Sequence, residues 1–425
     1  MQHAQEIDTE ASPSLRRAEE GDFPYVSDAA GMLYVAVSVI IMAFSAWFTV
    51  FPIFIFLLIW FRHIFYKGVF ILSPSPSLFA TLIFPFLCCY SAFWSDYPLT
   101  TLYHGIELLT LALSATIMMR IVPVKTFIKG LLLGIVITLG ITLASGNYTV
   151  DYLSKVSSLT GFFGSKNEVG FFAEIGIYLS LLMLGYTNFF EKLIFSFIPL
   201  IMCAACLYLS KSATSVASMI MLLGMSGTTY IIMRMPQQLR GLAIAGVFLS
   251  LITGGLIIAA GHFDIFDATL NALGKNPTLT GRTYLWSEGL RNGMERPMLG
   301  YGYTAFWIPG RPEAEEYWSE FFIPGKTGFH FHNLFIQTFV DVGLVGLSLM
   351  VWSLIANCGR GIGLLWRRGL TLESGLVFGL SWMFLLRACF EVDVLGPYGM
   401  GPLLFFALMA MQAPVKRAIP TPNAE

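Results

Sequence analysis

The sequence predicts an all-α polytopic membrane protein with about twelve transmembrane helices. Of its 425 residues, 56% are hydrophobic and 12% are charged, and the mean hydropathy is +0.70. Soluble domains carry about 25% charged residues, so the low charge favours a helix bundle embedded in lipid. After the first thirty residues, long apolar segments follow one another with a single long polar interruption, residues 262–332.

The apolar segments have the length of membrane-spanning helices, which is about 20 residues. Residues 31–61 form an apolar run that is long for one span and short for two, and we divide it into a hairpin. The predicted spans are residues 31–47, 49–62, 77–95, 99–119, 124–145, 167–188, 191–209, 212–233, 240–261, 333–356, 371–390 and 396–413.

The distribution of lysine and arginine supports the hairpin, because cytoplasmic loops are enriched in these residues. A hairpin collects most of them on one side, whereas a single span would set the N-terminus against every later loop. Both termini are therefore expected in the cytoplasm. The residues collected there are Arg16, Arg17, Arg62, Lys67, Arg120, Lys125, Lys192, Arg234, Arg240, Arg360, Arg367, Arg368, Lys416 and Arg417.

This topology divides the chain into five parts. Residues 1–30 are polar and are expected to form a disordered cytoplasmic N-terminus. Residues 31–261 hold the first nine helices and residues 333–413 the last three, while residues 414–425 form a cytoplasmic tail. Residues 262–332 form a long external loop that carries eight acids, six bases and three of the six histidines.

Charge is costly within the bilayer and cheap at its surface, so we expect the loop of residues 262–332 to carry the chemistry. A solvated connecting loop is the alternative. Within it, Thr283 to Glu295 can form a helix that Pro297 stops. A second helix begins at Pro312, with acids in its first turn where they suit the helix dipole.

The composition argues against other classes of function. The formal net charge is −1 and no basic run is present, so nucleic acid is not an expected partner. Cys203 and Cys206 have the spacing of a redox motif but lie within an apolar run. We interpret them as small packing residues, because free cysteine behaves as a small buried hydrophobe.

Three stretches combine into a family pattern. They read GFFGSKNEVG at 161–170, GRTYLW at 281–286 continuing to RPMLGYG at 296–302, and HFHNL at 330–334 continuing to DVGLVG at 341–346. WSDYP at 94–98 precedes them and EVD at 391–393 follows. In this order, the chain resembles the O-antigen ligase and polysaccharide polymerase family of bacterial inner membranes, most of all its exopolysaccharide polymerase branch.

The resemblance implies a membrane glycosyltransferase with the C-type fold, acting at the periplasmic face of the inner membrane. Its donor would be an oligosaccharide on undecaprenyl diphosphate, transferred with inversion and without metal, nucleotide sugar or other cofactor. The acceptor would be another lipid-linked repeat unit in a polymerase, or lipid A-core or a protein in a ligase. Chain-length regulator and export proteins are candidate partners. A transporter or flippase is the alternative from another class, although no internal repeat is evident.

The resemblance also assigns roles to residues. His332 matches the loop histidine of the family and would act as the base, with His330 as the second choice; imidazole titrates near neutral pH. Arg282 would bind the diphosphate, because guanidinium binds phosphate bidentately. Relatives have a second arginine in the segment that matches residues 210–214. Depending on the register, it is replaced here by Lys211 or lost at Ala213, and Lys166 could also contribute charge. The supporting residues would be Asn167, Asn333, Arg387, Glu391 and Asp393.

Two further expectations concern charged residues within the spans. Arg387 and Glu391 are four residues apart, so we expect an ion pair on one helix face. Asp341 follows His332 by nine residues, about 2.5 helical turns, so it faces away from His332. We therefore expect Asp341 to have a structural role.

Overall fold

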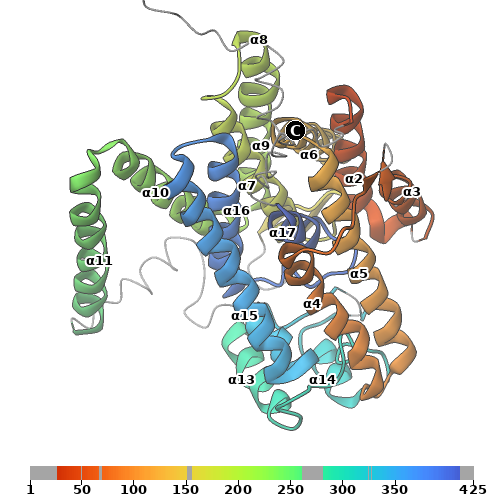
Figure 1. The fold of residues 1–425 in the computed structure, drawn as a ribbon. Helices are drawn as coiled ribbons and strands as arrows, with labels where there is room; N and C mark the ends of the chain where they lie inside the picture. The colour runs from red at the N-terminus through yellow and green to blue at the C-terminus, as the bar shows by residue number, and fades with distance from the viewer. Residues whose placement is uncertain are drawn as a thin grey trace, which may run out of the picture.

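The computed structural model describes residues 26–48, 50–66, 69–150, 156–260, 281–323, 325–326 and 328–411 (Figure 1). The predicted disordered N-terminus lies outside these residues except for its last five positions, and the predicted tail, residues 414–425, lies outside them entirely. The first 19 residues of the expected external loop, 262–280, also lie outside the described part.

Helices occupy all of the segments predicted to span the membrane. They are α2 (Asp28–Phe48), α3 (Val50–Phe61), α4 (Pro76–Tyr90), α5 (Pro98–Ile121), α6 (Val124–Ser145), α7 (Lys166–Met183), α8 (Phe189–Lys192) continuing through a π-helical turn into α9 (Ile198–Ser210), α10 (Ala213–Arg234), α11 (Gln237–Ala260), α15 (Leu334–Arg368), α16 (Leu372–Ala388) and α17 (Met400–Ala410).

Seven of the described helical segments are long and apolar enough to cross a membrane, which confirms a polytopic, all-helical membrane protein. The hairpin predicted for residues 31–61 forms as α2 and α3. With 12 residues, α3 is about 18 Å long, which is less than the hydrocarbon thickness of a bilayer. The short strand pairs β1–β2 (Phe65–Tyr66, Val69–Phe70) and β3–β4 (Tyr148–Val150, Ser157–Leu159) are antiparallel.

The helices pack in pairs, with α2 against α6, α4 against α5, α7 against α9 and α15 against α16. Figure 1 shows α10 and α11 at the edge of this bundle. Small residues permit the closest contact. A Cβ atom on Gly130 or Gly134 of α6 would lie 2.6 Å from Val35 or Val39 of α2. Close backbone approach at small residues is how helices associate in lipid.

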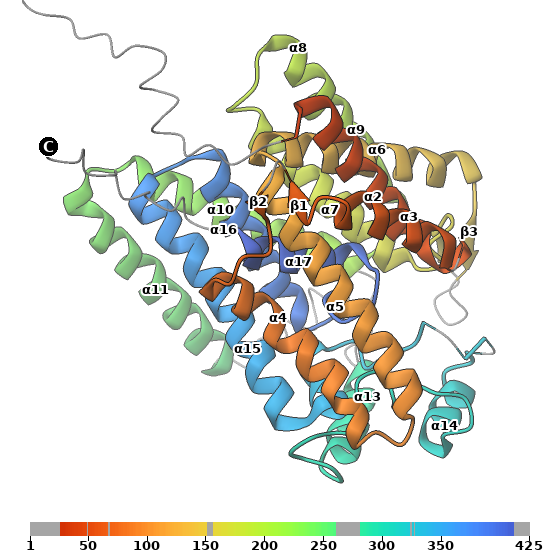
Figure 2. The ribbon, with the colours of Figure 1, turned by 45° about the vertical axis from the view of Figure 1, so that its right-hand side comes forward.

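The two helices predicted within the external loop are present, as α13 (Arg282–Gly293) and α14 (Pro312–Glu320). Figures 1 and 2 both show them at one end of the bundle, beside the ends of α4, α5 and α15. They pack on each other and on α15 through a second apolar cluster of their own. Its buried members are Leu285, Tyr301, Phe306, Tyr317, Phe331, Ile336 and Val340.

A break in α15 anchors this loop to the bundle. Val342 and Gly343 leave the helical conformation, with Gly343 at φ +65°. Residues 297–302 lie in the break: the amide of Leu344 donates to the carbonyl of Pro297 (2.8 Å), and the amide of Tyr301 donates to the carbonyl of Val340 (2.9 Å). The loop thus satisfies backbone groups that the interrupted helix leaves unpaired.

The α4–α5 turn provides a second anchor for the same loop. The indole N–H of Trp94 donates to the carbonyl of Leu299 (2.8 Å), and Asp96 pairs with Arg296 (2.9 Å) and with Arg311 (3.4 Å). Two separate attachments therefore position the loop over the end of the bundle, where α7, α15 and α16 meet.

Candidate active site

His332 lies immediately before α15 in a segment fixed from several sides. Asn333 is the N-cap of the helix, and its side-chain oxygen accepts from the amides of Phe335 (3.0 Å) and Ile336 (3.1 Å). His332 itself has φ +52°, in the left-handed region, and its amide donates to Nδ1 of His330 (3.0 Å). Capping and this hydrogen bond together hold a backbone conformation that L-residues seldom adopt.

The chain between the two histidines is held as well. The carbonyl of Phe331 accepts from the indole N–H of Trp286 on α13 (3.0 Å), and its amide donates to the side chain of Gln337 (3.3 Å). Gln337 in turn donates to Asp341 (3.1 Å). Asp341 therefore supports the segment through Gln337, in keeping with the structural role expected for it.

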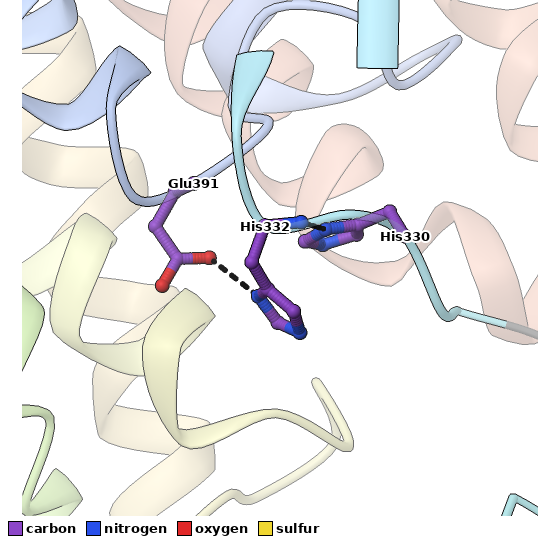
Figure 3. A group of neighbouring side chains, drawn as sticks. All are labelled: His330, His332 and Glu391. Carbon is purple, nitrogen blue, oxygen red and sulfur yellow. Dashed lines mark hydrogen bonds and ion pairs between the residues drawn. The ribbon is translucent and has the colours of Figure 1, made fainter. Parts of the chain in front are cut away.

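Glu391 contacts three of the predicted site residues, and each of the three lies on a different part of the chain. One carboxylate oxygen accepts from Arg282 of α13 (2.8 Å) and from Asn167 of α7 (2.9 Å), and the other lies 3.4 Å from Nδ1 of His332. Figure 3 shows the His332 ring turned toward Glu391, with His330 on the far side of the backbone. The Glu391 side chain is 5% exposed and that of His332 is 24% exposed, so the imidazole is the accessible member of the pair.

The protonation states follow from these contacts. Burial opposes the ionisation of Glu391, but the hydrogen bond to His332 and the positive charges of Arg282 and Arg387 hold its pKa below the ordinary value. Burial, with the neighbouring His332 acting in the same direction, lowers the pKa of His330 to about 3. His330 is therefore neutral at physiological pH, with Nδ1 occupied as an acceptor and the proton on Nε2.

Comparison with known proteins identifies the family. The sequence profile described as O-antigen ligase matches residues 198–351. The exopolysaccharide production protein ExoQ of Rhizobium meliloti (strain 1021) is 33% identical over 403 residues, which cover 94% of this chain and 92% of that protein. The chain belongs to the O-antigen ligase family. A candidate polysaccharide ligase of Rickettsia conorii is 29% identical over 149 residues, or 34% of this chain and 35% of that protein.

Members of the O-antigen ligase family are bacterial multi-pass membrane glycosyltransferases that act on lipid-linked glycans as polysaccharide polymerases or ligases. The site described above lies partly in the matched profile, which includes Arg282 and both histidines. Asn167 and Glu391 lie outside it on either side. The structure thus adds contacts from α7 and from the 389–399 loop to the part of the chain that the family profile covers.

The structure corrects one expectation for this family site, the ion pair between Arg387 and Glu391. Helix α16 ends at Ala388, so the two residues do not share a helix face. Arg387 instead binds Asp393 through two nitrogens (2.6 and 3.0 Å) and Glu174 of α7 (3.0 Å). Asp393, the fifth residue after the end of α16, therefore forms the ion pair that the sequence suggested for Glu391.

Serines connect the Arg387 cluster to the site. The hydroxyl of Ser212 donates to the side-chain oxygen of Asn167 (3.0 Å) and lies 3.1 Å from the hydroxyl of Ser215, which accepts from Arg387 (3.0 Å). The sequence analysis did not single out these serines, because serine is common wherever membrane helices pack closely, whether or not a functional site is present. Only the juxtaposition of α7, α10 and α16 reveals the network.

The two lysines predicted to bind the diphosphate lie in different surroundings. Lys211 ends α9 in the left-handed conformation (φ +52°), and its ammonium lies 3.8 Å from the ring centroid of Tyr208. The structure therefore directs Lys211 toward an exposed aromatic ring instead of toward Glu391. Lys166 is the first residue of α7, next to Asn167, and the side chain of Ser165 caps that helix.

One donor atom from each of His330, His332 and Glu391 lies within 4.8 Å of the others, which is close enough to share a metal ion. The surroundings fit such an ion poorly. Arg282 already places a positive charge 2.8 Å from the same carboxylate, and Nδ1 of His330 already accepts the amide of His332. The donor set instead fits an imidazole base beside an anion-binding guanidinium.

Proposed function

We propose that this protein transfers a glycan from undecaprenyl diphosphate to a lipid-linked repeat unit, and so polymerises an exopolysaccharide. The observation that carries the proposal is the convergence of Arg282 and His332 on Glu391 at the end of the helix bundle. Glycosyl transfer from a diphosphate needs a cation for the leaving group and a base for the attacking hydroxyl, and these two side chains supply both.

The reaction would be a single displacement. The acceptor oxygen forms a bond to the anomeric carbon, its proton passes to Nε2 of His332, and the bond from that carbon to the diphosphate oxygen breaks. Undecaprenyl diphosphate leaves with the bonding electron pair, and the anomeric configuration inverts. Arg282 stabilises the charge that grows on the leaving oxygen, and neither metal nor nucleotide sugar takes part.

The membrane arrangement belongs to the same proposal. Twelve crossings with both termini in the cytoplasm place α13, α14 and the whole site at the periplasmic face, where lipid-linked glycans are elongated. The distribution of lysine and arginine supports this orientation. Chain-length regulator and export proteins would act on the product at the same face.

A ligase that transfers the glycan to lipid A-core or protein is the second candidate. The family description and the Rickettsia conorii relative favour it, but that relative matches only 34% of this chain. The exopolysaccharide production protein of Rhizobium meliloti matches 94% of it, which favours polymerisation.

The test is a transfer assay with purified protein in liposomes. We expect synthetic undecaprenyl-diphosphate oligosaccharide alone to give longer lipid-linked glycans and free undecaprenyl diphosphate, with full activity in EDTA. Transfer only after lipid A-core is added would favour the ligase. Movement of the substrate across the bilayer without any new glycosidic bond would instead show a transporter.

A further inference from the structure

We propose that Glu391 is a positioning residue with two successive tasks. It neutralises Arg282 while the donor site is empty, and it orients His332 while transfer takes place. The inference rests on the proposed function and deepens it, because it names the internal anion with which the donor diphosphate must compete.

The first task follows from the pair with Arg282. Both side chains are largely buried, at 14% exposed for Arg282 and 5% for Glu391, and a buried guanidinium without an anion would be costly. A diphosphate brings more negative charge than one carboxylate and offers bidentate oxygens, so it competes for the same guanidinium. Donor binding therefore replaces a carboxylate on Arg282 and does not merely fill an empty site.

The second task follows from the contact with His332. A carboxylate accepts hydrogen bonds and cannot donate them, so the Nδ1 atom that faces Glu391 at 3.4 Å carries the proton. The lone pair of the neutral imidazole then lies on Nε2, the nitrogen that takes the acceptor's proton. Such an orienting carboxylate fixes the tautomer of a histidine base without reacting itself.

Asn167 allows Glu391 to change partners without leaving His332. Its amide N–H donates to the same oxygen that Arg282 binds (2.9 Å), and its own oxygen is fixed by Ser212 (3.0 Å). When Arg282 turns to the diphosphate, Asn167 still holds this oxygen. The other oxygen of Glu391 therefore remains directed at His332.

The experiment measures the transfer rate against donor concentration with full-length protein in liposomes. Glu391→Gln removes the competing charge and the orienting carboxylate together. We expect KM for the donor to fall several-fold and kcat to fall by about 100-fold, within the range that general-base catalysis contributes. Glu288→Gln is the matched control, since Glu288 pairs with Arg291 and Tyr317 and contacts none of Arg282, His332 and Glu391, so it should leave both parameters unchanged.

Glu391→Asp retains the charge and shortens the side chain, so kcat should fall while KM stays near the wild-type value. This variant also tests the proposal if Glu391→Gln does not fold. In the His332→Asn background, Glu391→Gln should reduce kcat no further, because its effect passes through His332. An unchanged or raised KM in Glu391→Gln, or wild-type kcat in Glu391→Asp, would overturn the inference. Absence of transfer by the wild-type protein would refute the proposed function instead.

Discussion

His330 and His332 are two residues apart, and the sequence left both as candidates for the base. The structure separates them by their hydrogen bonds. Nδ1 of His330 accepts the amide of His332 and its pKa is lowered to about 3, so it is a weak base with one nitrogen occupied. The His332 side chain is 24% exposed and faces a carboxylate. No sequence pattern could reveal this, because it depends on a left-handed backbone at His332.

The sequence indicated Arg282 through the Gly-Arg motif of the family, but it did not indicate the contact of Lys211 with Tyr208. Arg282 is the first residue of α13, and its guanidinium forms an ion pair with Glu391. Lys211 follows a helix end and lies over Tyr208, a contact that requires knowledge of where the ring points. The second cation of the proposed diphosphate site thus remains a prediction, with Lys166 as the alternative.

Arg282→Lys tests whether the guanidinium geometry matters. Lysine keeps the charge but loses the fork that binds a diphosphate bidentately, so we expect kcat/KM to fall by about 10- to 100-fold, or roughly 1.4 to 2.8 kcal/mol. Arg291→Lys is the control, because Arg291 lies on the same helix and also pairs with a glutamate, but away from the site. Equal rates for both variants in the liposome assay would remove Arg282 from the diphosphate site.

At the scale of elements, α15 shows what hydrophobic periodicity cannot predict. The apolar run from residue 333 to 356 predicts one continuous span, although it contains Asp341 and Gly343. The structure breaks the helix at Val342 and Gly343, where residues 297–302 enter. The break depends on a loop some forty residues earlier in the chain, so only tertiary structure reveals it.

Gly343→Ala tests the break in α15. A Cβ atom there would lie 2.3 Å from the carbonyl group of Met298, and the backbone has φ +65°. We expect a loss of about 1–3 kcal/mol or more, seen as a lower thermal midpoint in detergent and lower transfer activity. Gly359→Ala on the same helix meets open space and should be neutral or slightly stabilising. Similar melting of the two variants would contradict the role assigned to the break.

At the scale of the whole molecule, the apolar segments predicted nearly all of the helical bundle. Every predicted span coincides with a helix, because lipid requires backbone groups to bond within their own segment. The spatial order of the helices was not predictable, because each is apolar over most of its surface and several partners would satisfy it. The meeting of α7, α13 and the 389–399 loop at Glu391 belongs to this unpredictable part.

The proposed orientation is tested by cysteine labelling in spheroplasts, with the native cysteines replaced. Ser319→Cys on the exposed face of α14 should react with a membrane-impermeant thiol reagent before lysis. Gly185→Cys, between α7 and α8, is the control on the opposite side, where an added Cβ meets no atom within 4 Å. It should react only after lysis. The reverse pattern would invert the topology and move the site to the cytoplasm.

The most direct test of the central claim is glycan transfer by His332→Asn in liposomes with undecaprenyl-diphosphate oligosaccharide as donor. Asparagine tolerates the left-handed backbone at this position, so the fold should persist while the base is lost. We expect the protein to purify normally and the release of undecaprenyl diphosphate to fall by at least about 100-fold. His63→Gln, at the other end of the bundle, should transfer at the wild-type rate. Wild-type transfer by His332→Asn would contradict the account.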